Sequence, residues 1–434
     1  MLKRHILVFM SCFLWLVVPA RVLAVLTIEI TGGLEAGMPI AVVPFEWIGQ
    51  GPPPVDLRDV ISADLDRSGR FDVLPVEDYL SRPSNDRDLQ YKDWRLIKAE
   101  ALVVGKIREI SGGRFDVRFQ LFDVFREKQL TGYHREIEES QLRKFAHQAS
   151  DHIVRALTGK GPAFDSRISY VTVERAASTG PIYKLMVADS DGYGPDEIVQ
   201  SSDPILSPSW SPNGRYLAYV SFEDGWSKVI IQEIDTASRE KIAEWSGINQ
   251  APAWSYDGRK LAMSLSHEGN SEIYVMDLKS RSLQRLTYHS EIDTSPAWAP
   301  NGRSLVFMSD RSGRPQIYRI PTAGGKAVRM TFEGRENSRP SFSPDGKSLL
   351  MVTNDGNGTQ IGVFSLSDKH LRILTNGPFD ESPTFAPNGS MVLYATKQEG
   401  RELLEIVSVD GQVQQVLRFN RGDIYSPAWS PLNR

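Results

Sequence analysis

Short apolar stretches separated by polar turns recur at a fixed interval from about residue 205 to the end of the chain. Each copy has a proline two residues before an aromatic residue, as in SPAWAPNGRSLVFMSD at 295–310. The aromatic residues are Trp210, Trp254, Trp298, Phe342, Phe385 and Trp429, spaced by 44, 44, 44, 43 and 44 residues. A period in the low forties with strand-like content predicts the four-stranded blade of a β-propeller.

The pattern inside one copy predicts the four strands. Pro-x-aromatic gives a short inner strand, Asn-Gly or Asp-Gly gives a hairpin turn, and an apolar second strand follows. The third strand is visible at 272–278 and 316–321, and the fourth at 282–288 and 327–332. Their apolar residues alternate or run together, as strands buried between neighbouring blades require. We therefore expect the repeated aromatic residue to pack blade against blade rather than to stack on a ligand.

The sixth copy, SPAWSPLNR, ends at the C-terminus without its second half. The missing part is found earlier in the chain, because 167–173 resembles a second strand and 183–192 resembles a third strand with its turn. The two chain segments complete one blade, so six aromatic residues predict six blades. Pairing of the N- and C-terminal strands of the propeller closes the ring and leaves no open sheet edge.

Residues 25–160 carry no such repeat and predict a small α/β domain, followed by the propeller at 161–434. The predicted elements are a strand at 38–45, a helix within 56–71, strands at 101–107 and 114–122, and a helix at 141–157. Both helices place apolar residues on one face. Gly159 and Gly161 indicate the linker.

Residues 1–24 predict a secretory signal peptide. Lys3 and Arg4 precede an apolar run at 6–18, and small residues end the segment at Ala24. The alternative is a membrane anchor, but the apolar run is short for a span and is followed by a proline and an arginine. The only cysteine of the chain lies inside this segment, so the exported protein is stabilised by packing rather than by disulfides.

Composition narrows the function further. Without the signal peptide, 47 basic residues stand against 54 acidic ones, a mildly acidic balance that argues against a nucleic-acid partner.

The chain has no serine nucleophile elbow, glycine-rich phosphate loop or metal-protease helix. His147 and His152 are five residues apart on a helix, which does not give a metal-binding pair, and we expect ordinary surface or half-buried histidines. Asp189–Gly192 (DSDG) faintly resembles a calcium loop but lacks the later ligands. We predict no catalytic, cofactor-binding or metal-binding residues.

Polar loops are the remaining candidates for function. In a propeller blade, the loop entering the inner strand and the loop between the second and third strands emerge on the same side, around the channel. A single polar loop is usually just solvated, but a ring of them favours a docking surface. The entering loops contain Asp203, Asn249, Glu291, Asp293, Arg335, Glu336, Arg339, Asp380, Glu381, Arg421 and Asp423.

The combination of a signal peptide, GMPIAVVPF at 37–45, GPAFDSRISYV at 161–171 and six SPxWSPDG-type blades resembles the TolB family, periplasmic components of the Tol-Pal system of Gram-negative bacteria. The resemblance implies a non-enzymatic periplasmic adaptor without cofactors, held at membranes only through its partners. It would bind the peptidoglycan-associated lipoprotein Pal through the propeller mouth and TolA through the mature N-terminus, and support outer-membrane integrity and constriction at cell division. It leaves room for other outer-membrane partners.

The resemblance also implies site residues. The family's Pal-contacting positions fall at Ile248, Asn249, Ala251 and Thr294, and Ile248 stands where the family often has a histidine. Because the entering loops converge, we add Asp293, Asn337, Arg339, Asp380 and Glu381 to the Pal site, and we expect the acidic side chains to meet basic or amide groups of Pal. The TolA site is expected at Val25, Leu26, Thr27, Ile28, Glu29 and Ile30, whose alternation suits a strand that adds to a partner's sheet edge.

Two other classes of function stay open from the residues alone. A propeller-gated exported peptidase would need a separate hydrolase domain with a serine motif, and no segment is left to supply it. A periplasmic sensor of a carbohydrate or peptide would hold a small ligand in the channel.

Overall fold

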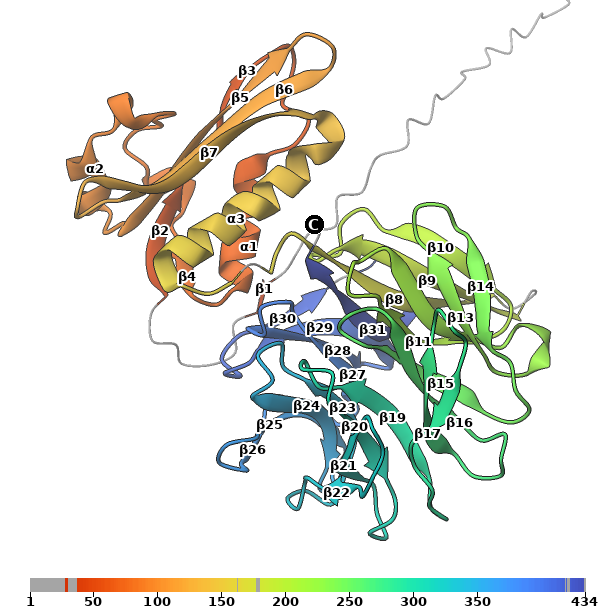
Figure 1. Ribbon diagram of the computed structural model, residues 1–434. Helices are drawn as coiled ribbons and strands as arrows, with labels where there is room; N and C mark the ends of the chain where they lie inside the picture. The colour runs from red at the N-terminus through yellow and green to blue at the C-terminus, as the bar shows by residue number, and fades with distance from the viewer. Residues whose placement is uncertain are drawn as a thin grey trace, which may run out of the picture.

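The computed structural model describes residues 28–29, 37–161, 163–176, 180–417, 419 and 422–432. These residues form an α/β domain and a six-bladed β-propeller beside it (Figure 1). Within the described ranges, no helix combines the length and apolar character needed to cross a membrane. The predicted signal peptide at 1–24 lies outside the described residues.

The α/β domain is built on one sheet with the strand order β4-β2-β5-β6-β7, and β3 pairs with β5 beside β2. Strand β2 runs parallel to β4 and β5, whereas β5, β6 and β7 form an antiparallel meander. The strands are β2 (Met38–Val42), β3 (Glu46–Ile48), β4 (Phe71–Val73), β5 (Ala101–Ile110), β6 (Arg114–Asp123) and β7 (Lys128–Glu138). The helices are α1 (Leu57–Arg67), α2 (Tyr91–Leu96) and α3 (Leu142–Thr158).

Alternation along β2 decides which helix covers which face of the sheet. Ile40 and Val42 belong to the core shared with α1 and α3, whereas Ala41 and Val43 pack in a second core with Trp94 of α2. Successive side chains of a strand point to opposite faces, so one short strand serves both cores. Helices α1 and α3 lie between the sheet and the propeller (Figure 1).

The propeller consists of six four-stranded antiparallel blades, as the 44-residue period predicts. The blades are β31 (Asp423–Leu432) with β8 (Ser166–Ala176), β9 (Gly180–Asp189) and β10 (Asp196–Ser201); β11 (Ile205–Trp210), β12 (Tyr216–Ser221), β13 (Lys228–Glu233) and β14 (Arg239–Ala243); β15 (Asn249–Trp254), β16 (Lys260–Leu265), β17 (Glu272–Asp277) and β18 (Leu283–Arg285); β19 (Asp293–Trp298), β20 (Ser304–Ser309), β21 (Gln316–Pro321) and β22 (Val328–Arg329); β23 (Glu336–Phe342), β24 (Ser348–Asn354), β25 (Thr359–Ser365) and β26 (Leu371–Ile373); and β27 (Glu381–Phe385), β28 (Met391–Gln398), β29 (Arg401–Ser408) and β30 (Gln414–Leu417). We number them one to six in this order.

Blade one confirms the predicted closure of the ring. Its inner strand β31 comes from the C-terminus and pairs antiparallel with β8, with Asp423 opposite Val173 and Trp429 opposite Ile168. The Trp429 indole Nε1 also donates a hydrogen bond to Ser166 Oγ at 2.9 Å. The predicted fold, an α/β domain followed by a propeller closed by its terminal strands, is therefore confirmed.

Strands β3, β4 and β7, helix α2 and the pairing of β1 with the propeller were not predicted from the sequence. Strand β7 was missed because most of its side chains are partly or fully exposed and its sequence, KQLTGYHREIE, has little apolar alternation. Strand β1 (Ile28–Glu29) pairs antiparallel with β30, so blade six has a fifth strand. The other residues of the expected TolA site, Val25, Leu26, Thr27 and Ile30, lie outside the described residues.

The connection between α3 and β8 is fixed by one buried carboxylate. Asp151 accepts hydrogen bonds from the backbone N–H groups of Ala163 (2.7 Å), Phe164 (2.9 Å) and Asp165 (3.1 Å). Phe164 is buried in a core that includes residues of α3 and of blades one and six. The α/β domain and the propeller therefore share one continuous apolar core at this junction.

Candidate functional site at the propeller channel

The inner strand of every blade carries the same irregularity. In β15, the step from Gln250 to Ala253 faces the shorter step from Ser264 to Ala262 on β16, so β15 holds one extra residue, a β-bulge. The residue before the repeated proline adopts a positive φ between 48° and 53° in all six blades, a conformation that costs a non-glycine residue about 1 kcal/mol or more. These residues are Ser207, Ala251, Ser295, Arg339, Ser382 and Ser426.

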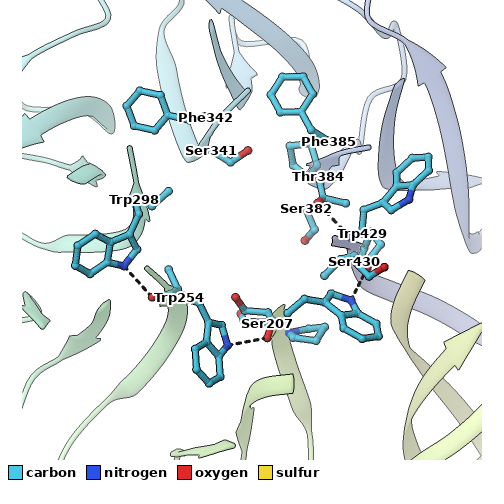
Figure 2. Close-up of a pocket in the computed structure, with 18 of the residues that line it drawn as sticks. Ser207, Trp254, Trp298, Ser341, Phe342, Ser382, Thr384, Phe385, Trp429 and Ser430 are labelled. Atoms are coloured by element: carbon cyan, nitrogen blue, oxygen red, sulfur yellow. Dashed lines mark hydrogen bonds between the residues drawn. The ribbon is translucent and has the colours of Figure 1, made fainter. Parts of the chain in front are cut away.

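The bulged residues and their prolines line a central cavity of about 680 Å³. Figure 2 shows this ring from along the channel: the aromatic rings of Trp254, Trp298 and Phe342 point away from the opening and into the blades. Five of the six bulged residues are serine or alanine, and only Arg339 has a long side chain. Its guanidinium donates to Ser382 Oγ of the next blade at 3.0 Å and lies 3.9 Å from the Glu381 carboxylate.

The repeated aromatic residues pack blade against blade, as predicted. The indole N–H of Trp254 donates to the Ser209 carbonyl at 3.1 Å, and that of Trp298 donates to the Ala253 carbonyl at 3.0 Å. Trp210 makes the equivalent bond to the Ala428 carbonyl at 3.1 Å. Each bond joins one blade to the inner strand of the preceding blade. Phe342 and Phe385 place an aromatic side chain at the same position, but phenylalanine has no N–H group to donate such a bond.

Several expected contact residues at the mouth have buried side chains. Asn249 and Asn337 are 0% exposed and occupy equivalent positions in their blades. The Asn249 amide donates to the carbonyls of Ser227 (3.0 Å) and Trp245 (2.8 Å), and the Asn337 amide donates to the Glu333 carbonyl (2.8 Å). These asparagines hold the entering loops in place, and their side chains do not face solvent.

Asp293 and Asp380, which we expect at the Pal site, have buried carboxylates. Asp293 is 0% exposed and accepts a hydrogen bond from the Arg311 guanidinium at 2.6 Å. Asp380 is 1% exposed and accepts one from Thr396 Oγ1 at 2.6 Å. Both residues lie at the start of an inner strand, where the side chain turns into the blade. Burial raises the pKa of Asp293 despite the opposing effect of Arg311.

The other expected contact residues remain accessible to different degrees. Ile248 is 47% exposed, and the side chains of Arg339 and Glu381 are 46% and 56% exposed. Thr294 is 8% exposed and accepts a hydrogen bond from Gln250 at 3.1 Å, and Ala251 is half-buried. Arg339 and Glu381 are brought together across two blades, whereas Ile248 stands at the entry to β15 in blade three.

The mouth also carries acidic groups on the loops of blade four and at the start of blade five. Burial, together with the neighbouring Glu291 and Glu336, raises the pKa of Asp310. A carboxyl group whose pKa is raised by other carboxylates indicates a local excess of negative charge. This region of the mouth favours a partner with basic or hydrogen-bond-donating groups.

Sequence reasoning missed a set of exposed apolar side chains in the mouth loops, which we call the apolar rim. They are Trp226 (56% exposed), Ile248 (47%), Tyr288 (73%), Ile292 (44%), Phe332 (73%) and Phe379 (60%). All belong to entering loops or to the loop between the second and third strands, the two sets that meet at the channel mouth. Large apolar side chains left in water around a polar centre are typical of a protein-binding surface. The sequence contains a signal for this rim: Tyr288 in LTY and Phe332 in MTF are aromatic residues just after the fourth strand of their blades.

The expectation for the helical histidines is correct for one residue and wrong for the other. His152 is exposed at the surface and packs beside Tyr133, with ring centroids 5.0 Å apart. His147 is 2% exposed, and its Nδ1 lies 2.8 Å from Asp64 Oδ2. It is buried because α3 packs there against both α1 and the propeller, which the sequence of α3 alone does not reveal.

The fold and the mouth define a class of protein: a six-bladed propeller with an amino-terminal α/β domain and exposed apolar side chains in its mouth loops. Family models described as the TolB beta propeller domain and the TolB amino-terminal domain match residues 154–433 and 26–130. The chain belongs to the TolB family, and is thus a component of the Tol-Pal system.

Similar proteins match this chain over nearly its full length. The chain is 57% identical to the Tol-Pal system protein TolB of Nitrosococcus oceani over 97% of both chains, and 54% identical to that of Thioalkalivibrio sulfidiphilus over 96% of both. The crystal structure of TolB from Acinetobacter baumannii superimposes with a TM-score of 0.85 at 37% identity, covering 94% of this chain and all of the other.

Proposed function

We propose that this protein is a non-enzymatic periplasmic adaptor that binds the lipoprotein Pal at the propeller mouth and TolA through residues 25–30 of the mature N-terminus. In this role it supports outer-membrane integrity and constriction during cell division. Membership of the TolB family supports the Tol-Pal setting. The observation that carries the Pal site is the apolar rim of the mouth loops, together with the accessible Arg339–Glu381 pair.

The mouth suits a protein partner for two physical reasons. The apolar rim offers area that leaves water when a partner covers it, and the polar centre gives orientation through hydrogen bonds and charge. The loops are also anchored: Asn249 and Asn337 fix them to the blades, and the bulged inner strands are held by their neighbours. A surface that is already ordered loses less entropy on binding.

The N-terminal site is supported by the backbone of Ile28–Glu29. This segment pairs antiparallel with β30, with Ile28 opposite Gln415 and Glu29 opposite Gln414. The same N–H and C=O groups would be used to add a strand to the sheet edge of TolA. In this proposal the segment leaves β30 when it binds TolA.

Titration calorimetry with the soluble domain of Pal tests the mouth. Because Asp293 is buried, the informative variant combines Ile248→Asp with Glu381→Lys, two accessible positions. We expect Pal affinity to fall at least about tenfold, on the order of 1.4 kcal/mol. Asp257→Lys, in the hairpin turn at the opposite end of the channel, is the matched control and should bind Pal like the unaltered protein. Equal affinities of the two variants would place the Pal site elsewhere.

Deletion of residues 25–31 tests the N-terminal site. The shortened protein should lose TolA binding and keep Pal binding, because the mouth loops are unchanged. Retained TolA affinity would refute the assignment of the N-terminus.

A further inference from the structure

A cluster of buried and partly buried charged side chains lies where α1 and α3 meet the end of β9 and the turn that follows it in blade one. It draws on both domains and takes no part in the channel mouth. Its members are Asp64 and Arg67 of α1, Arg143 and His147 of α3, Asp189 at the end of β9 and Asp191 of the turn.

His147 has one ring nitrogen with a partner and one without. Its Nδ1 lies 2.8 Å from Asp64 Oδ2, and Asp64 is in turn paired with buried Arg67. Its Nε2 is buried and makes no hydrogen bond, yet it lies 3.9 Å from Asp189 Oδ2 and 3.9 Å from Asp191 Oδ2. When Nδ1 donates its proton to Asp64, the Nε2 lone pair faces two carboxylate oxygens. That arrangement is unfavourable unless a metal ion lies among the three atoms or Nε2 itself carries a proton.

We propose that His147 Nε2, Asp189 and Asp191 bind a divalent metal ion of the zinc class. The three ligand atoms lie within 4.8 Å of one another. Tetrahedral zinc, with bonds of about 2.0–2.2 Å, needs ligand atoms about 3.4 Å apart, so a small inward movement of the side chains completes the site. One imidazole with two carboxylates suits zinc better than calcium or magnesium, which prefer oxygen ligands alone.

The surroundings have the form of a metal site. A metal-binding histidine usually donates its other ring N–H to a carboxylate, which fixes the ring and makes it more basic, and Asp64 provides this contact. Arg143 donates to Asp189 Oδ2 at 3.3 Å and also to Asp191 Oδ2. A carboxylate oxygen has two lone pairs, so it can accept from Arg143 and still ligate a metal.

The net charge of the cluster and its access to solvent also favour a bound cation. Three carboxylates face the two guanidinium groups of Arg67 and Arg143, so the cluster has a formal charge of −1 when His147 is neutral. The side chains of Asp189 and Asp191 are 35% and 13% exposed, so an ion reaches the site from solvent past Asp189. Because the histidine and the aspartates come from different domains, the ion would tie the α/β domain to blade one.

The test uses the full mature protein without a polyhistidine tag, stripped with EDTA and titrated with zinc chloride at neutral pH. We expect one zinc per chain and a melting temperature that rises with zinc and falls again with EDTA, because a ligand that binds only the folded state stabilises it. Calcium and magnesium chloride at the same concentration should give neither effect.

Matched variants separate this site from other histidines. Asp189→Asn keeps the side-chain shape at a partly exposed position and should weaken zinc binding at least about tenfold. Asp64→Asn leaves all three ligands but loses the carboxylate behind His147, and should weaken binding by about tenfold. His152→Gln, on the same helix, should bind zinc like the unaltered protein.

Three results would overturn the proposal. They are no binding at submillimolar zinc, equal zinc affinity in Asp189→Asn and His152→Gln, or a melting temperature that responds to pH but not to zinc. The last would mean that a proton on His147, rather than a metal, compensates the two carboxylates.

Discussion

The ion pair between Asp293 and Arg311 allows a test of which mouth residues stabilise the fold and which are free to contact a partner. Asp293→Asn removes the carboxylate charge and keeps the side-chain volume. The Arg311 guanidinium, whose side chain is 17% exposed, would then keep its charge without its 2.6 Å partner. It lies over the rings of Phe307 and Tyr318, at 5.4 and 4.9 Å from their centroids, and cannot swing freely into water.

The expected loss in the free energy of unfolding of Asp293→Asn follows from this geometry. Burial raises the pKa of Asp293, so the pair contributes little net stability compared with an apolar pair of the same size. Removing one partner is a different change, because it leaves a charge without compensation, which costs about 3–5 kcal/mol for a fully buried pair. Since Arg311 keeps some contact with water, we expect about 2–4 kcal/mol. For a propeller of this size the melting temperature should fall by roughly 3–7 °C.

Glu381→Gln is the control, because it removes the same charge from a side chain that is 56% exposed and 3.9 Å from Arg339. An exposed ion pair is worth about 0–1 kcal/mol, so the melting temperature should change by no more than about 2 °C. Calorimetric melting of both variants measures the contrast. If Asp293→Asn melts at the same temperature as Glu381→Gln, the Asp293–Arg311 pair does not hold the mouth together and the reasoning from burial fails.

Three further predictions concern the ring and the export of the protein. Trp298→Phe should cost about 1–2 kcal/mol in urea unfolding, because the Ala253 carbonyl loses its indole donor; no change in midpoint would show that the indole bond contributes nothing. Deletion of residues 423–434 should expose the edge of β8 and cause aggregation or loss of the cooperative melt, and an unchanged melting profile would contradict the role of β31 in closure. The exported protein should begin at Val25 by intact-mass measurement, and a retained Met1 would disprove the signal peptide.

The propeller could be predicted from the sequence because its information is local and repeated. Five copies each contain the inner strand, the hairpin turn and the second strand within about 15 residues, and they confirm one another. Even the closure by β31 could be predicted, since a half copy at one end and its complement near residue 167 have few other ways to pair. Strand β7 carries no comparable signal, because a partly exposed edge strand does not need apolar alternation.

The direction of side chains at the mouth could not be predicted in the same way. Asp293 and Glu381 both stand beside the start of an inner strand, yet one carboxylate is buried and the other is in water. The difference follows the register of the strands: Asp293, opposite Ser309, occupies the same position as buried Asp380, whereas Glu381 stands one residue further along, where the side chain points the other way. Similarly, His147 and the DSDG turn each look unremarkable in the sequence, and only the packing of α3 on blade one brings them within 4 Å.

The proposed Pal site and the proposed zinc site lie at opposite ends of the blades, so their variants can be tested separately. The α/β domain contacts the propeller through hairpin turns: Arg143 meets the turn after β9, and the Gly161 carbonyl accepts a hydrogen bond from Asn388 in the turn after β27. In an antiparallel blade, the turns after the first and third strands lie at one end and the entering loops at the other. The mouth loops thus face away from the junction and stay open to a partner. A loss of Pal binding in an Asp189 variant would therefore have to act through the blade rather than through contact.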